Sequence, residues 1–198
     1  MLTAIGSALI VDDPPAPVDA LVVSMAALRP SALEAARLHR DGIGRRIVIA
    51  RWQPEALDDE MRRLGVPWLP PHELAAAMLV QSGVPSTAIE LLDDSVDGLN
   101  TEIAAVAAWV RRTQPESLLY LTARSHTRRA SWMLHRLLAA DVRFLVHAPA
   151  RDAFRPDGWW RSRTGSREVT MEYLRWVNTF ALGDLWRREP ASVPEPFD

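Results

Sequence analysis

Short aliphatic runs alternate with longer helical stretches along this chain, and that alternation constrains the fold more than any other feature. Each run is four to six residues long and mostly apolar, as expected for strands buried on both faces of a sheet. Strands that alternate with helices are typical of βαβ units with a parallel sheet. The sequence therefore predicts a three-layer α/β/α sandwich around a mostly parallel, Rossmann-like sheet of about five strands. The expected strands are 20–23, 47–50, 89–92, 118–122 and 142–147.

Helix signals fill the segments between these strands. Ser31 and Glu34 have the spacing of a capping box, so a helix is expected to open at Pro30 and Ser31 and to stop at Gly42. The other expected helices are 54–64, 71–82, 100–113, 126–140 and 166–186.

No internal repeat or linker interrupts the pattern. Residues 19–188 are predicted to form a single α/β domain, between an N-terminal lead-in over 1–18 and a loose C-terminal tail over 189–198. The apolar start, residues 1–11, is shorter than the roughly 20 residues that span a bilayer, and it has no basic leader. It either packs on the domain as a strand or short helix, or ends a longer anchor. As written, the chain is expected to be cytoplasmic, with membrane association through residues upstream of the lead-in as the alternative.

Composition excludes several kinds of chemistry. The chain has 198 residues, a formal net charge of -2 and a pI near 6.2, so nucleic acid is not an expected partner. It has no cysteine, which excludes disulfides, thiolate zinc sites and a cysteine nucleophile. All 23 basic residues are arginine, so lysine Schiff-base chemistry is also excluded. The five histidines lack metal-ligand spacing, so no metal is predicted. No Walker loop or GxSxG elbow occurs, so the usual nucleotide-binding and serine-hydrolase signatures are absent.

The segment TARSHTRRA, residues 122–130, contains the most informative group of polar side chains. Three arginines, with Ser125 and His126, lie at or just before the start of an expected helix. The helix dipole disfavours each cation there by some tenths of a kcal/mol. An anion such as a phosphate, carboxylate or sulfate would offset that cost if free N–H groups held it, with Ser125 as the cap and Arg129 and His126 beside it. The alternative is that acidic residues of neighbouring loops pair with these arginines.

Three other segments carry polar side chains with two interpretations each. After the third strand, Asn100 and Thr101 either cap the next helix, with Glu102 matching its dipole, or form a wall of the same cleft. His72 and Glu73 begin a helix, where a carboxylate is either ordinary dipole matching or part of a zinc site, which the absence of an HExxH motif disfavours. The arginines and tryptophans of residues 151–175 either pin a loop to the core or grip a ligand.

In this order the segments resemble the SanA/YdcF/ElyC-type family of bacterial envelope-linked domains of unknown function. TARSHTRRA is similar to the family motif Thr-Ser-x-x-His-x-x-Arg-Ala, and LNTE to its Asn-Thr motif. The segment WWRSRTGSREVTMEYLRW is similar to its closing Trp and Glu helix, and the likeness covers nearly the whole chain. The resemblance implies that His126, Arg129, Asn100, Thr101, Glu73 and Glu172 line or buttress a cleft.

The chain departs from the family in two loops. Residues 24–27 stand where the family has a Gly-Gly turn, and Arg51 and Trp52 stand where it has a Ser-Gly segment. The acidic residue expected two positions after Thr101 is shifted to Glu102. Because glycine lets backbone approach a ligand closely, the missing glycines in these two loops would narrow one half of the cleft.

The sequence and the resemblance together predict a protein that binds an anionic, phosphorylated or nucleotide-like small molecule and is linked to cell-envelope biogenesis. AdoMet-like and nucleotide ligands are among the candidates. The alternative is a non-catalytic interaction module that keeps the fold without the glycine-lined half of the site. His126 is the candidate general acid or base, with water as the nucleophile. Candidate ligand-binding residues are Ser125, Arg129, Asn100, Thr101, Glu73 and Ser24, with Glu102, Arg128, Trp159 and Glu172 in support.

Overall fold

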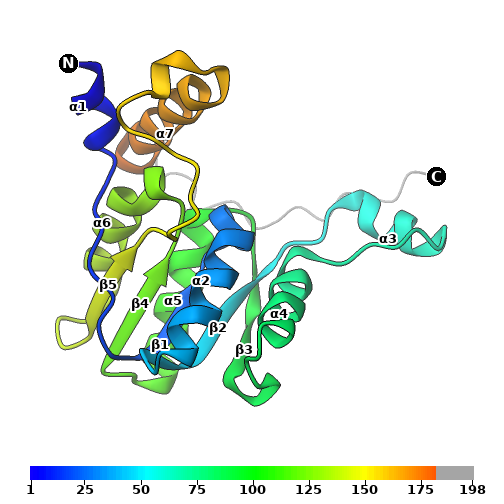
Figure 1. Cartoon of the computed structure of the whole chain (residues 1–198). Helices are drawn as coiled ribbons and strands as arrows, with labels where there is room; N and C mark the ends of the chain where they lie inside the picture. Colours follow the sequence, from blue (N-terminus) through cyan, green and yellow to red (C-terminus); the bar gives the residue numbers. More distant parts are fainter. Residues whose placement is uncertain (182–198) are drawn as a thin grey trace.

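A computed structural model describes residues 1–181 and contains one five-stranded sheet (Figure 1). The strands are all parallel and lie in the order β3-β2-β1-β4-β5. The predicted α/β fold with a parallel Rossmann-like sheet is confirmed. The strands are β1 (Val18–Val23), β2 (Gly44–Trp52), β3 (Ile89–Val96), β4 (Ser117–Leu121) and β5 (Arg143–His147).

Successive strand residues point to opposite sides of the sheet, and the side chains on both sides are apolar. Helices therefore cover both faces of the sheet. One face packs against α5 and α6, and the other against α2 and α4. The α-helices are α1 (Leu2–Ser7), α2 (Leu28–Arg40), α3 (Ala56–Arg63), α4 (Pro71–Gln81), α5 (Leu99–Thr113), α6 (Thr127–Leu137) and α7 (Arg163–Ala181). Short 3-10 turns are η1 (Met25–Ala27), η2 (Ser86–Ala88), η3 (Arg124–His126) and η4 (Trp159–Arg161).

The predicted start of α2 is wrong. The helix begins at Leu28 because η1 runs directly into it, and Ser24 caps η1 by accepting a hydrogen bond from the Ala26 N–H. Ser31 and Glu34 are therefore buried inside the helix instead of forming a capping box, and Ser31 donates to the carbonyl of Leu121. The predicted stop is confirmed at Gly42, which has a φ of +75°.

Other boundaries moved by a few residues. β2 and β3 run further than predicted, because their ends pair with each other beyond a register shift. α6 ends at Leu137, three residues before the predicted end. α7 begins at Arg163, and the end of the predicted closing helix over 166–186 lies outside the described residues, as does the predicted tail.

The N-terminal segment packs on the domain, which is the first of the two alternatives for residues 1–11. Leu9 is buried with Phe154 and Val169. Further along, the N–H of Asp13 donates to the carbonyl of Val146, and its carboxylate accepts the N–H of Val146. The lead-in thus covers the free edge of β5. In the part of the chain that the structure describes, no helix is long and apolar enough to cross a membrane.

Candidate functional site

The strand order reverses direction between β1 and β4, and the carboxyl ends of these two strands define the candidate site. The chain leaves β1 through Ser24 and η1, and leaves β4 through Thr122 and η3. The hydroxyl of Thr122 donates to that of Ser24 over 3.3 Å, so the two exits lie side by side. Ligands of open α/β sheets bind beyond such a reversal, which is where the sequence placed the site.

Arg129 and Glu172 form a buried ion pair beyond the end of β4. The Nε and Nη2 of Arg129 lie 2.6 and 3.1 Å from the two carboxylate oxygens of Glu172. The residues are only 3 % and 0 % exposed. The Nη1 of Arg129 also donates to the side-chain oxygen of Asn100 over 3.2 Å. The alternative of pairing with the protein's own carboxylates therefore holds for Arg129, although the partner comes from α7 and not from a loop.

His126 and Arg175 share the same carboxylate. The Nε2 of His126 lies 3.2 Å from Oε2 of Glu172, and the Nη1 of Arg175 lies 3.6 Å from that oxygen. Burial lowers the pKa of His126, and Arg129 and Arg175 lower it further against the opposing effect of Glu172. With His126 neutral, two guanidinium groups face one carboxylate. Among the groups in contact with Glu172, positive charge therefore exceeds negative charge by one, and Asp152 and Glu168 add negative charge close by.

A second buried network lies between β1 and β4, below this cluster. Glu102 accepts hydrogen bonds from the hydroxyl of Tyr120 over 2.6 Å and from the N–H of Met25 over 3.1 Å. Burial raises the pKa of Glu102 to about 7, against hydrogen bonds from Tyr120, Met25 and Ser24 that lower it. Through these two hydrogen bonds the buried Glu102 connects η1 to β4. Ser24 is also completely buried, so its side chain offers no surface to a ligand.

The sequence left two roles open for Asn100 and Thr101, capping α5 or lining the cleft, and the structure gives each residue a different one. The hydroxyl of Thr101 accepts hydrogen bonds from the N–H groups of Asp97 and Gly98 and donates to the carboxylate of Asp97, so it caps α5. Asn100 is exposed and joins Arg129. Capping therefore explains Thr101, whereas Asn100 belongs to the cluster.

Ser125 does not cap α6, which corrects the prediction. Its side chain is buried and donates to the carboxylate of Glu168 over 2.5 Å. The turn η3 leads directly into α6, so the helix start shows no side-chain cap. Burial raises the pKa of Glu168, the hydrogen bond from Ser125 lowers it, and Asp152 and Glu172 raise it. Ser125 and Arg129 thus both tie the β4 exit to α7.

Three predicted residues lie apart from this cluster. Glu73 is exposed in the first turn of α4, on the other face of the sheet. Arg128 is exposed and donates to the carbonyl of Ile10 in the lead-in. The indole N–H of Trp159 donates to the carbonyl of Leu2, and the ring packs against α1. These contacts support the interpretation that the tryptophan loop is pinned to the core.

Sequence reasoning missed Tyr120 and Glu168 as members of these networks, and it included Arg175 only among the arginines of residues 151–175. Two signals could have found them. Glu168, Glu172 and Arg175 have the spacing of one helix face in the closing helix. A tyrosine inside an apolar strand usually needs a hydrogen-bond partner, and here the partner is Glu102.

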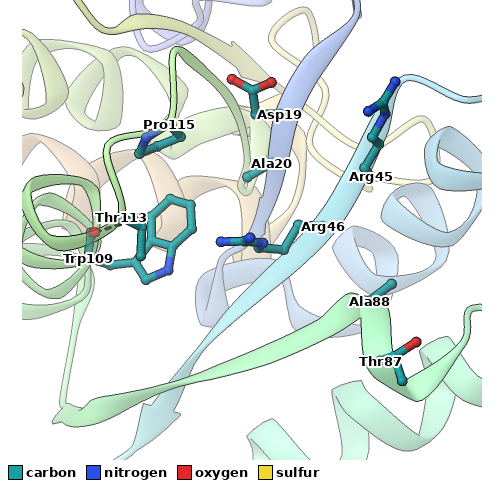
Figure 2. Close-up of a pocket in the computed structure, with 9 residues that line it drawn as sticks. All are labelled: Asp19, Ala20, Arg45, Arg46, Thr87, Ala88, Trp109, Thr113 and Pro115. Carbon is teal, nitrogen blue, oxygen red and sulfur yellow. Dashed lines mark hydrogen bonds between the residues drawn. The ribbon is translucent and has the colours of Figure 1, made fainter.

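Neither of two hollows is lined by Arg129, but the first adjoins its cluster through Glu168, which accepts a hydrogen bond from Ser125. One of about 570 Å³ is lined by residues 153–168, including Trp159 and Glu168. The other, of about 370 Å³, lies at the opposite, amino-terminal edge of the sheet, where Figure 2 shows Arg46 pointing towards Trp109. Glu90 accepts the indole N–H of Trp109 over 2.8 Å and lies 3.4 Å from Arg46. Because Glu90 already balances the charge of Arg46, the hollow beside Trp109 is a weaker candidate for an anion site than the Arg129 cluster.

Models of known protein families, characterised proteins and solved structures were compared with the chain, and none matched. Among residues 1–181, no group of three or more histidine or acidic side chains could hold a metal ion. The fold and the cluster around Glu172 are therefore the basis on which a function can be argued.

Proposed function

We propose that this chain binds an anionic small molecule, phosphorylated or nucleotide-like, where the start of α6 meets α7. The observation that carries the proposal is the sharing of one buried carboxylate, Glu172, by Arg129, Arg175 and His126. Glu172 balances only one of the two guanidinium groups that contact it; Glu168 and Asp152 add negative charge nearby, but neither lies within ion-pair distance of Arg175. An added anion would balance the other and would gain charge-assisted hydrogen bonds.

The groups of this cluster differ in how open they are to a ligand. Arg175 exposes about half of its side chain, 47 %, and Asn100 is also exposed. Arg129 and His126 lie deeper, beside the first turn of α6, whose positive dipole end adds to the attraction for an anion. The proposed contacts are therefore Arg175 and Asn100 directly, with Arg129 and His126 behind them.

Any chemistry at this site would depend on His126. Because burial lowers its pKa, the imidazole is neutral near pH 7 and able to accept a proton from water. Arg129 would then stabilise negative charge that develops on the ligand. Binding does not require this step, so the proposal concerns binding first.

The resemblance to the SanA/YdcF/ElyC-type family supports a role in cell-envelope biogenesis. Phosphorylated and lipid-linked sugar precursors are anionic molecules of the class that this cluster would take. Nucleotides, sugar phosphates and AdoMet form the natural test set, because the first two carry phosphate and the third carries a carboxylate.

Ligand-induced thermal stabilisation and calorimetry test the proposal. We expect at least one phosphorylated compound to stabilise the protein and Arg175→Ala to remove that effect. Arg112→Ala, which deletes one exposed charge at the far end of α5, is the matched control and should bind as the wild type does. Equal binding by both variants, or binding of no anion, would contradict the proposed site.

An interaction module without a small-molecule ligand is the second candidate, and one observation favours it. Where the family has a Gly-Gly turn, the N–H of Met25 is occupied by Glu102 and Ser24 is buried. This half of the crevice therefore offers a ligand fewer free donors. Under this alternative no anion stabilises the protein, and Arg175→Ala melts as the wild type does.

A further inference from the structure

The outer face of α7 carries a row of apolar side chains that faces solvent. Met171, Leu174 and Val177 follow one another at three-residue spacing, and each exposes between 40 % and 63 % of its surface. Phe180 is also exposed, but its ring packs against Trp176 and against Trp132 of α6, so it lies on the side of α7 that faces α6. Neighbours at this spacing lie on adjacent parts of a helix surface. The inner face of the same helix holds the buried Glu172. Single exposed apolar residues are ordinary, but a continuous row of them marks an interaction surface.

Arginines extend this row towards the start of the helix. Arg163 and Arg167 precede Met171 at four-residue spacing, so they continue the same side of α7, and Arg161 lies just before them in η4. All three arginines are exposed. Within the described stretch 155–181, Asp157 is the one carboxylate of the exposed class. This face is therefore cationic although the whole chain has a formal net charge of -2.

We propose that the outer face of α7, from Arg163 to Val177, docks on an anionic lipid surface. The apolar row would enter the boundary between headgroups and acyl chains, and the arginines would contact the anionic headgroups. A helix that lies in the membrane plane need not span the bilayer, so the proposal agrees with the lack of a spanning helix among residues 1–181. Figure 1 places α7 beside α1 at one side of the molecule, away from α3.

Charge and side-chain type favour lipid over two other occupants. A second copy bound through the same face with parallel helices would bring two arginine-rich ends together, and like charges at an interface are costly; an antiparallel pair would leave these arginines without an acidic partner, because this face has no exposed carboxylate between Arg163 and Val177. Single-stranded nucleic acid binds through flat aromatic rings on which bases stack, whereas the exposed row is mainly aliphatic. A protein surface that binds an anionic membrane uses both kinds of side chain, aliphatic residues for the acyl chains and arginines for the headgroups.

This surface is separate from the proposed anion site. Glu172 and Arg175 belong to the cluster with Arg129, whereas the docking surface uses Leu174 and Val177 on the outer side of the helix. Vesicle binding by the ligand-free protein therefore tests the docking surface alone, and its result does not depend on whether the anion site exists.

The experiment is cosedimentation of the whole chain with vesicles of phosphatidylcholine, alone or mixed with phosphatidylglycerol. We expect binding to the mixed vesicles. Leu174→Ser with Val177→Ser should weaken it by about tenfold or more. The matched control changes Leu57→Ser and Leu64→Ser, two exposed apolar residues on or next to α3, and should bind as the wild type does.

A second variant tests the charges without touching the apolar row. Arg163→Gln with Arg167→Gln should weaken binding to the mixed vesicles by about fivefold for each arginine, and added salt should reduce the difference. Thermal melts test whether each variant folds. If Leu174→Ser with Val177→Ser does not fold, Arg163→Gln with Arg167→Gln still tests the proposal.

Three results would overturn the proposal. One is a wild type that binds neither kind of vesicle. Another is an equal loss of binding in the control on α3. The third is a concentration-dependent dimer without vesicle binding, abolished by Leu174→Ser with Val177→Ser, which would assign the face to a second copy.

Discussion

Arg129 and Glu172 meet through two hydrogen bonds, of 2.6 and 3.1 Å, with both side chains buried. The pair joins the first turn of α6 to the middle of α7. Removing one partner of a buried pair leaves the other charge without compensation. We therefore expect Arg129→Leu or Glu172→Leu alone to lower the free energy of unfolding by about 3–5 kcal/mol.

The double variant provides the internal control. Arg129→Leu combined with Glu172→Leu should cost less than the sum of the single changes, because neither charge is left alone. For comparison, Arg62→Ala removes an exposed arginine whose partner Asp59 is also exposed, and should cost at most about 1 kcal/mol. Urea unfolding measures all four variants. Additive single effects would show that the two charges do not compensate each other.

Glu102 should make stability fall as the pH rises. Burial raises its pKa in the folded chain from the ordinary 4.5 to about 7, so between these values the folded chain keeps a proton that the unfolded chain has released. Its contribution is therefore fully present below about pH 4.5 and is lost as the pH rises towards about 7. The slope is at most about 1.4 kcal/mol per pH unit.

Comparison with Glu102→Gln isolates this effect from other titrating groups. The difference in unfolding free energy between wild type and variant should shrink or reverse as the pH rises, because glutamine does not titrate. Tyr120→Phe removes a hydrogen bond that lowers the pKa of Glu102 and should move the slope to higher pH. A difference that is constant with pH would contradict the raised pKa.

The fold could be predicted from the sequence because its signals are local and repeated. Apolar runs such as 20–23 and 47–50 need burial on both sides, and only strands between helical layers provide it. The start of α2 could not be predicted in the same way. Ser31 and Glu34 have the right spacing for a cap, but η1 supplies a helical turn upstream, so the helix begins earlier.

The place of the Arg129 cluster in the fold could be predicted from the sequence, whereas its contacts could not, and its use as a binding site stays a prediction. The position of Arg129 after β4 follows from the strand-helix pattern. Its partner Glu172 is 43 residues away, and spacing along the chain does not show which carboxylate will face it. Burial of Ser24 and Glu102 is equally non-local, because it depends on Tyr120 from another strand.

His126 should titrate below its ordinary value of 6.5 and respond to ligand. Burial lowers its pKa in the free protein, with Arg129 and Arg175 acting in the same direction and Glu172 opposing them. A bound anion would favour the imidazolium and raise that pKa, so binding should take up protons at pH values between the pKa of the free protein and that of the complex. Nuclear magnetic resonance titration of the imidazole nitrogens with and without phosphate measures the change.

His72 is the matched control for this titration. Burial also lowers its pKa, but its Nδ1 accepts the N–H of Trp52 at the end of β2, and it is not part of the Glu172 cluster. Its titration should therefore not respond to phosphate. A free-protein pKa of His126 at or above 6.5, or equal responses of both histidines, would contradict the role given to His126.

Gly6 should be essential for docking α1 on the tryptophan loop. A Cβ there would lie 2.7 Å from Cδ1 of Trp159 and 2.8 Å from the carbonyl oxygen of Pro156, a backbone atom that cannot move aside alone. We expect Gly6→Ala to cost about 1–3 kcal/mol and to make the N-terminal segment more sensitive to limited proteolysis. Gly158→Ala, in the same loop but with no atom within 4 Å of the new Cβ, should change neither property. Equal effects of both substitutions would show that the close contact at Gly6 does not hold α1 in place.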